Sequence, residues 1–148
     1  MNLETYPLVV PRILLNGKCS EALKLYQKAF GATVKEKILF SEADPMDFKY
    51  TGKEKDNFVY YAELMIGKYM VMMNDDDDGV LGDHTGIKPS LTTLCISFDS
   101  EEKARAAYEV LLDGANILAP ITSASFYSFY VSLEDKFGVA WDLYFGDA

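Results

Sequence analysis

The chain has few basic residues, one histidine, two cysteines and no long apolar run, and each shortage disfavours a class of function. Only 14 lysines and arginines stand against 23 aspartates and glutamates, which gives a net charge of −9. Nucleic acids need basic patches that neutralise phosphates, and anionic membranes attract basic segments, so we expect neither partner. We also expect no membrane span and no signal peptide, because no apolar run reaches 18 residues or follows a basic segment.

The two cysteines, Cys19 and Cys95, show no CxxC spacing and are too few for a disulfide framework. Isolated thiols suit a reducing compartment, so a cytoplasmic protein is expected, with a single disulfide as the alternative. Cys95 lies in the apolar segment TTLCISF, which predicts a small buried residue and not a nucleophile.

What the sequence does have is apolar material and a clear order of elements. Apolar residues make up 49% of the 148 residues and aromatic residues 14%, enough for one domain with a sizeable core. One predicted helix starts at the N-cap Ser20 and ends at Gly31. Another starts at a D-x-x-E capping box, Asp99 with Glu102, and ends at Gly114. Apolar and alternating segments predict the strands, at Leu8–Leu15, Thr33–Phe40, Phe58–Ile66, Tyr69–Met73, Ser90–Phe98, Asn116–Ile121, Phe126–Leu133 and Val139–Phe145.

The two helix exits share one local pattern. GATV at Gly31 and GANI at Gly114 are 83 residues apart (114 − 31). Each half then reads β-α-β-β-β, so the chain is predicted to be an α+β protein of two tandem modules, at about 6–74 and 88–146, with an acidic linker at 75–87. Two such sheets would form a half-open barrel whose cavity is the natural ligand site.

Three segments carry a family resemblance: NGKCSEALKLYQKAFGATV, YAELMIG and DKFGVAW. They resemble the vicinal oxygen chelate superfamily of glyoxalases, bleomycin-resistance proteins and extradiol dioxygenases, and within it the PhnB-like branch. The resemblance covers almost the whole chain. It implies the glyoxalase/bleomycin-resistance fold and a homodimer whose paired sheets complete the cavities. It says little about chemistry, because that superfold hosts many functions.

The resemblance also implies where a metal would sit. Enzymes of the superfamily hold one divalent ion with four side chains, typically histidine or glutamate, two from each repeat. Counting from the repeat landmarks places these positions near Val10, Met72, Thr93 and Asp142. Three of the four are not ligands for such an ion, so we expect no metal and no other cofactor.

Asp142 is the first candidate for a ligand contact. Alternation places it on the cavity side of its strand, opposite an apolar set that includes Trp141. The alternatives are a partly exposed surface acid, or one paired with Arg12 or a lysine.

Tyr61 and Glu63 share a strand face, and relatives in the branch often carry a histidine where Tyr61 stands. A phenol there loses a base that works at neutral pH. Glu63 is either a pocket acid, able to do acid–base work with Asp142, or an exposed charge at an open face or a dimer edge.

Other residues are weaker candidates. Tyr127 belongs to an aromatic cluster, Phe126 to Tyr130, that lines either the cavity or a subunit interface. Met65, Met70, Met72 and Met73 would line the cavity or fill the core. The 41–57 loop is a candidate lid. His84 and the run Asp75–Asp78 are expected to be solvated turn residues.

The sequence therefore predicts a metal-free protein of this superfold that binds a small, partly apolar molecule. The candidate ligand-binding residues are Asp142, Glu63, Tyr61, Met72, Thr93 and Tyr127. A lyase, isomerase or dioxygenase with a non-standard site at Asp142 and Glu63 is the alternative, and a stand-alone interaction module is a third hypothesis.

Overall fold

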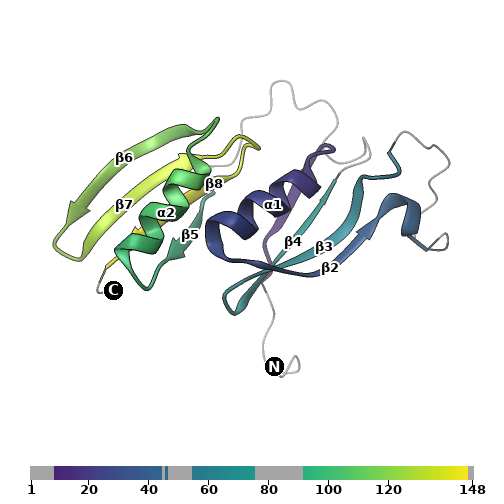
Figure 1. Cartoon of the computed structure of the whole chain (residues 1–148), viewed down its shortest axis with the longest axis horizontal. Coiled ribbons are helices and arrows are strands. Elements are labelled where there is room, and N and C mark those ends of the chain that lie inside the picture. The colour runs from purple at the N-terminus through teal and green to yellow at the C-terminus, as the bar shows by residue number, and fades with distance from the viewer. Residues whose placement is uncertain (1–8, 45, 47–54, 76–91, 147–148) are drawn as a thin grey trace. The chain divides into compact units, whose positions relative to one another are not determined.

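The structure is a computed structural model, and it describes residues 9–44, 46, 55–75 and 92–146 (Figure 1). The elements follow the order β1 (Arg12–Leu15), α1 (Cys19–Phe30), β2 (Thr33–Leu39), a 3-10 turn (Phe40–Glu42), β3 (Val59–Ile66), β4 (Tyr69–Asp75), β5 (Leu94–Ser97), α2 (Glu101–Leu111), β6 (Asn116–Ala124), β7 (Tyr127–Glu134) and β8 (Ala140–Phe145). This order confirms the α+β prediction of two βαβββ modules. The half-open barrel between their sheets stays a prediction.

The chain forms two compact units. The first holds β1 to β4 in a sheet of order β1-β4-β3-β2, and the second holds β5 to β8 in the order β5-β8-β7-β6. In each sheet the first and last strands of the module pair in parallel, while the other pairs are antiparallel. Helix α1 is divided: its residues up to Leu23 cluster with the first unit, and Lys24–Gly31 cluster with the second. No helix among the described residues is long and apolar enough to cross a membrane.

The second sheet buries one face under helices. Phe129, Val131, Leu133, Trp141 and Leu143 alternate along β7 and β8 and are fully buried. The ring of Trp141 packs against Tyr26 and Phe30 of α1, and Phe129 packs against Tyr108 of α2. Trp141 and Leu143 therefore lie on the helix-covered face, and Asp142 between them points to the opposite, helix-free face.

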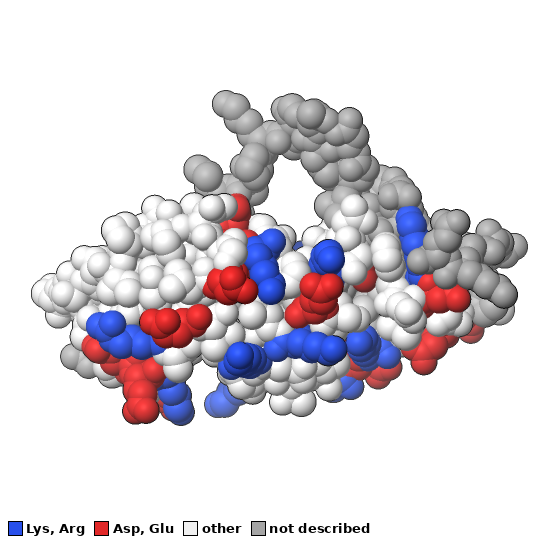
Figure 2. Space-filling view, turned by 45° about the horizontal axis from the view of Figure 1, so that its top comes forward, with Lys and Arg blue, Asp and Glu red and all other residues white. Residues whose placement is uncertain are grey.

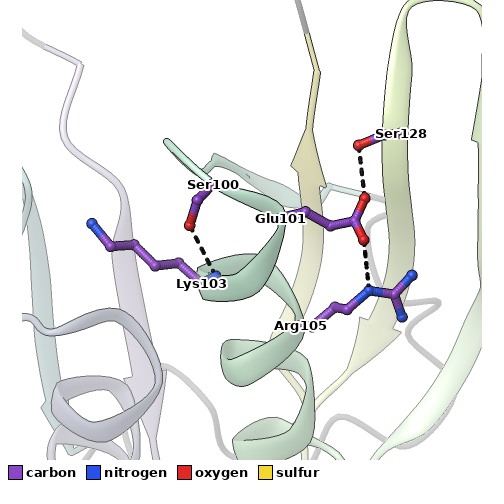
Figure 3. A network of polar contacts seen from close by, with 5 residues as sticks. All are labelled: Ser100, Glu101, Lys103, Arg105 and Ser128. Atoms are coloured by element: carbon purple, nitrogen blue, oxygen red, sulfur yellow. Dashed lines mark hydrogen bonds and ion pairs between the residues drawn. The ribbon is translucent and has the colours of Figure 1, made fainter.

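Both predicted helix starts are wrong by one or two residues. Helix α1 begins at Cys19, so Ser20 lies inside its first turn. The N-cap of α2 is Ser100, whose hydroxyl accepts a hydrogen bond from the Lys103 backbone N–H (Figure 3). Asp99 instead pairs with the Lys103 ammonium at 2.9 Å. The predicted glycine end holds for α1, which Gly31 follows directly with a φ of 63°. Helix α2 ends earlier than predicted, at Leu111 with the C-cap Leu112, and Gly114, with a φ of 76°, lies two residues beyond that cap.

A polar network joins α2 to β7 (Figure 3). Glu101 in the first turn accepts hydrogen bonds from Ser128 Oγ at 2.9 Å and from Arg105 Nε at 3.0 Å. These two bonds, that from Arg105 first, lower the pKa of Glu101. The Arg105 guanidinium also lies 4.8 Å from the centre of the Phe129 ring. The start of α2 is thereby fixed over the buried face of β7.

Candidate functional site

Three residues of the second sheet form one row across its helix-free face, and a fourth lies beside that row. The strand register pairs Asp142 of β8 with Cys95 of β5 on one side and with Ser132 of β7 on the other. Tyr130 lies two residues before Ser132 on the same face. The row and Tyr130 together bring a carboxylate, a thiol and two hydroxyls close to one another.

The carboxylate of Asp142 is incompletely satisfied. The residue as a whole is half-buried, but its Oδ1 atom is closed off from solvent and has no hydrogen-bond partner among the described residues. An ionised carboxylate has about four acceptor positions, and an enclosed oxygen without a donor is costly. Arg12 belongs to the first unit, where its Nε donates to Asn74 at 2.9 Å, so the alternative of a pairing with Arg12 stays a prediction. Asp142 is thus the described side chain most in need of a donor.

The neighbours of Asp142 respond to its charge. The pKa of the Tyr130 phenol is raised by burial first, and then by the charge of Asp142 and a hydrogen bond to it. The pKa of the Cys95 thiol is raised by partial burial and by the same charge. Cys95 is exposed, which corrects the expectation of a buried residue: β5 is an edge strand, and Cys95 points away from the core. Both shifts keep a proton on the groups that surround the carboxylate.

A β-bulge brings Tyr127 to the same face. The register of β6 and β7 shifts between Thr122 and Ala124, opposite Ser128 and Phe129. Consecutive residues of a regular strand point to opposite faces, yet Ser128 and Phe129 both contact α2. The extra residue returns Tyr127 to the side of Tyr130, and the two ring centres are 5.6 Å apart.

The candidates in the first unit lie on a comparable face of its sheet. One row there reads Arg12, Met72, Glu63 and Glu36 across the four strands. Burial raises the pKa of Tyr61 first, and the charge of Glu63 and a hydrogen bond to it raise it further. Glu63 and Tyr61 are therefore together, as predicted, whereas their relation to Asp142 stays a prediction.

All six candidate residues are half-buried. Of the four methionines considered as lining, Met73 is fully buried in the core, and the other three are half-buried. His84, Asp76 to Asp78 and most of the candidate lid lie outside the described residues.

The residues at the expected metal positions do not fit a divalent ion. In the parallel pairs Met72 lies beside Arg12 and Asp142 beside Cys95, so Val10 and Thr93 come two residues earlier along their segments. Neither a guanidinium nor a thioether suits a hard or borderline ion. No three His, Cys, Asp or Glu side chains within 9–44, 46, 55–75 and 92–146 gather as a metal site.

Sequence reasoning missed Asp135, a buried acid that organises the turn before β8. Its side chain is 2% exposed and accepts four hydrogen bonds. Oδ1 accepts from the backbone N–H groups of Phe137 and Val139, at 2.8 and 3.1 Å. Oδ2 accepts from the Tyr26 hydroxyl at 2.6 Å and from the Trp141 indole N–H at 2.9 Å. The tyrosine of NGKCSEALKLYQKAFGATV and the tryptophan of DKFGVAW therefore meet at this carboxylate. These two residues contribute to the stability of the fold through Asp135.

Asp75 is a second buried acid, and its burial corrects the expectation of a solvated turn residue. It was expected to begin a solvated linker, but it ends β4 and is 3% exposed. Its carboxylate accepts from the backbone N–H of Cys19 at the start of α1 and from that of Val59. An acid at a helix N-terminus satisfies an otherwise unpaired donor. Burial, and then the charge of Asp75, raise the pKa of the Cys19 thiol to about 12.

A shallow groove of about 440 Å³ lies at the tip of the β6–β7 hairpin. Its lining is uncharged and consists of Ser123, Ala124, Ser125, Phe126, Tyr127, Ser128, Phe145 and Gly146. The aromatic cluster Phe126 to Tyr130 is the only feature of the sequence that indicated this groove.

Comparisons with known proteins find similarity in structure but not in sequence. No protein-family model matches the chain, and no curated protein matches it. Protein PA1353 from Pseudomonas aeruginosa is similar over 95% of this chain and 98% of its own, with a TM-score of 0.76 and 24% identity. The PhnB protein from Bacillus cereus is similar over 95% and 100%, with a TM-score of 0.74 and 20% identity.

A glyoxylase/bleomycin resistance protein/dioxygenase domain from Frankia sp. EAN1pec covers 95% of this chain and 92% of its own, at 14% identity and a TM-score of 0.63. At such low identities the likeness concerns the fold and leaves the chemistry open. The chain has the glyoxalase/bleomycin-resistance fold.

Proposed function

We propose that the chain binds a small, partly apolar molecule on the helix-free face of its second sheet. The single observation that carries this proposal is the enclosed Oδ1 of Asp142, which has no donor within the described part of the chain. Binding sites combine apolar and aromatic walls with a few polar groups that fix orientation. Tyr127 and Tyr130 supply the walls, while Ser132 and Asp142 supply the polar groups.

A thermal-shift screen of small aromatic compounds tests the proposal. A ligand that binds only the folded chain, at ten times its Kd, adds about 1.4 kcal/mol, or roughly 3–6 °C in Tm for a chain of this size. We expect such a shift in the wild type and its loss in Asp142→Ala. If no compound raises Tm, or if Asp142→Ala responds equally, the site is not at Asp142.

We also propose that binding uses no resident metal. The support is the donor set, because the expected ligand positions offer one carboxylate and no histidine. Metal analysis of protein purified without chelators tests this. One equivalent of tightly bound zinc, iron, nickel or manganese would overturn it.

The chain is further proposed to form a homodimer through the β6–β7 hairpin, which we define as residues 116–134. Strand β6 is a sheet edge, and all of its residues but Ala119 are exposed. Ile117, Leu118, Ile121 and Phe126 are all exposed, the last by 64%, and such a group of apolar side chains at one edge is typical of an interaction surface. Pro120 and three register shifts make this edge irregular, which disfavours hydrogen bonding of its backbone to another strand. A partner would therefore contact the side chains of β6.

Charge indicates a second copy as the partner on this surface. Residues 116–133 contain no charged side chain, and the part of Figure 2 over β6 and β7 is correspondingly white. Two chains of net charge −9 repel each other, and the repulsion is least where neither surface is charged. The hairpin therefore fits another copy of itself.

Sedimentation or light scattering tests the dimer. We expect a dimer for the wild type, a monomer for Leu118→Glu, and a dimer for Leu112→Glu, which alters an exposed leucine at the end of α2. A monomeric wild type, or a dimeric Leu118→Glu, would refute the proposal.

A further inference from the structure

We propose that the group bound at Asp142 is the ammonium of a primary amine carried on a flat or aromatic body. This inference rests on the proposed small-molecule site and names the chemical class of its ligand. It combines the charge of the second sheet, the donors that Asp142 lacks and the rings around it.

The charge of the sheet has one sign. Among the residues of β5 to β8 only Glu134 and Asp142 are charged, and both are acids. Glu134 accepts a hydrogen bond from Asn116 at 3.2 Å and so has a partner. The described basic residues of the second unit all lie on helices or in the turn before β8. They are Lys24, Lys28, Lys103, Arg105 and Lys136. Asp142 therefore faces a helix-free surface to which the strands contribute no cation.

The donors available to Asp142 are too few for an ionised carboxylate. The Tyr130 hydroxyl is the neighbouring donor whose pKa is raised by burial and then by Asp142, and Oδ1 has no hydrogen-bond partner among the described residues. An ammonium group brings three N–H donors and a positive charge, and bonds of this kind are about twice as strong as neutral ones. A small rotation of the half-buried side chain presents Oδ1 to such a group. An anionic ligand would instead meet an uncompensated negative charge.

The rings around Asp142 suit the same ligand. Tyr130 pairs with Tyr144 across β7 and β8, and Tyr127 lies against Tyr130. Ring faces attract cations within about 6 Å and stack on flat apolar groups. A bulky guanidinium or quaternary ammonium fits less well, because the oxygen that lacks a donor is enclosed. A primary amine on an aromatic body satisfies both the carboxylate and the rings.

Titration of the ¹⁵N-labelled full-length chain with three matched fragments tests the inference. Benzylamine, benzyl alcohol and benzoate share a ring and differ in the charge of one substituent. We expect benzylamine to shift the amide signals of Cys95, Ser132 and Asp142, benzyl alcohol to bind at least tenfold more weakly, and benzoate not to bind. Asp142→Asn should weaken benzylamine at least tenfold. Glu109→Gln removes one negative charge from α2 and should leave binding within twofold.

Three results would contradict the inference, and they separate it from the proposed function. If benzyl alcohol or benzoate binds as tightly as benzylamine at these amides, a small-molecule site exists but its ligand is not an amine. Equal weakening by Asp142→Asn and Glu109→Gln would show that net charge, and not Asp142, attracts the amine. If no fragment shifts these amides, and the thermal-shift screen also finds no ligand, both proposals fail.

Discussion

Replacing Asp135 with asparagine is expected to destabilise the chain far more than the same exchange at a surface acid. The substitution keeps the size of the side chain but replaces one oxygen with an NH₂ group. Four donors, from Tyr26, Phe137, Val139 and Trp141, share the two carboxylate oxygens. Two of these four donors would then face the new NH₂ group instead of an oxygen. A buried donor without an acceptor costs about 1–3 kcal/mol. The expected loss is about 2–6 kcal/mol, out of the roughly 5–15 kcal/mol that stabilise a typical domain.

Urea denaturation followed by tryptophan fluorescence measures this loss. Trp141 is the only tryptophan, and its indole N–H is one of the four donors, so the probe reports on the site itself. With a slope of about 1–3 kcal/mol per molar urea, the midpoint should fall by roughly 1–3 M. Tyr26→Phe removes one donor and should cost less, about 1.5–3 kcal/mol. The double variant should lose less than the sum, because both changes remove the same bond.

Asp99→Asn is the matched control. It makes the same chemical change in an acid whose side chain is 74% exposed and pairs with Lys103 at the surface. Exposed pairs contribute about 0–1 kcal/mol, so the midpoint should hardly move. If Asp135→Asn and Asp99→Asn shift the midpoint equally, the four bonds do not hold the turn, and this account of the DKFGVAW segment is wrong.

Four further outcomes follow from single contacts. Ser100→Ala should lower the free energy of unfolding, measured with urea, by about 1 kcal/mol, and Asp99→Ala should lower it much less. The opposite order would show that Asp99 caps the helix, as the capping box predicted. Ellman's reagent at pH 8 should label Cys95 alone in the folded chain, since the pKa of the buried Cys19 thiol is about 12. The Cys19 thiol ionises near pH 9.0 when it is exposed, so between pH 9 and 12 unfolding releases its proton. The free energy of unfolding should therefore fall with pH in this range, and it should fall less steeply in Cys19→Ala. Gly146→Ala should destabilise by about 1–3 kcal/mol, because its Cβ would lie 2.4 Å from a backbone oxygen of the hairpin tip.

The sequence predicted the order of elements well because that order depends on local physics. Alternation located β7 and β8 to within one residue, and the left-handed Gly31 ended α1 where a residue without Cβ is favoured. Gly114 lies three residues after the end of α2 and marks only the turn that follows this helix. The cap of α2 was missed by one residue, because Asp99 and Ser100 are both good caps and the choice depends on how the helix sits on β7.

The candidate site could be predicted only in part. That Asp142 lies opposite Trp141 follows from period-two alternation, and the structure bears it out. The neighbours of Asp142 depend on pairing between distant strands. The register places Cys95 beside Asp142, and Thr93, which counting placed at an expected metal position, lies two residues before Cys95. The bulge that redirects Tyr127 has no signal in the sequence, since bulges arise from how two strands pair.

Three acids of the chain show why burial alone does not identify a binding residue. Asp75 and Asp135 are almost fully buried, yet each accepts bonds from backbone donors at an element boundary, so their charge serves the fold. Asp142 lies in mid-strand, where the backbone donors are already used by the neighbouring strands. A carboxylate in that position can find donors only from side chains or from a ligand, and one of its oxygens finds none among the described residues. If Asp142 served stability, its replacement by asparagine would be costly, as at Asp135. A binding role predicts the opposite, a folded Asp142→Asn of unchanged or higher stability that no longer holds its ligand.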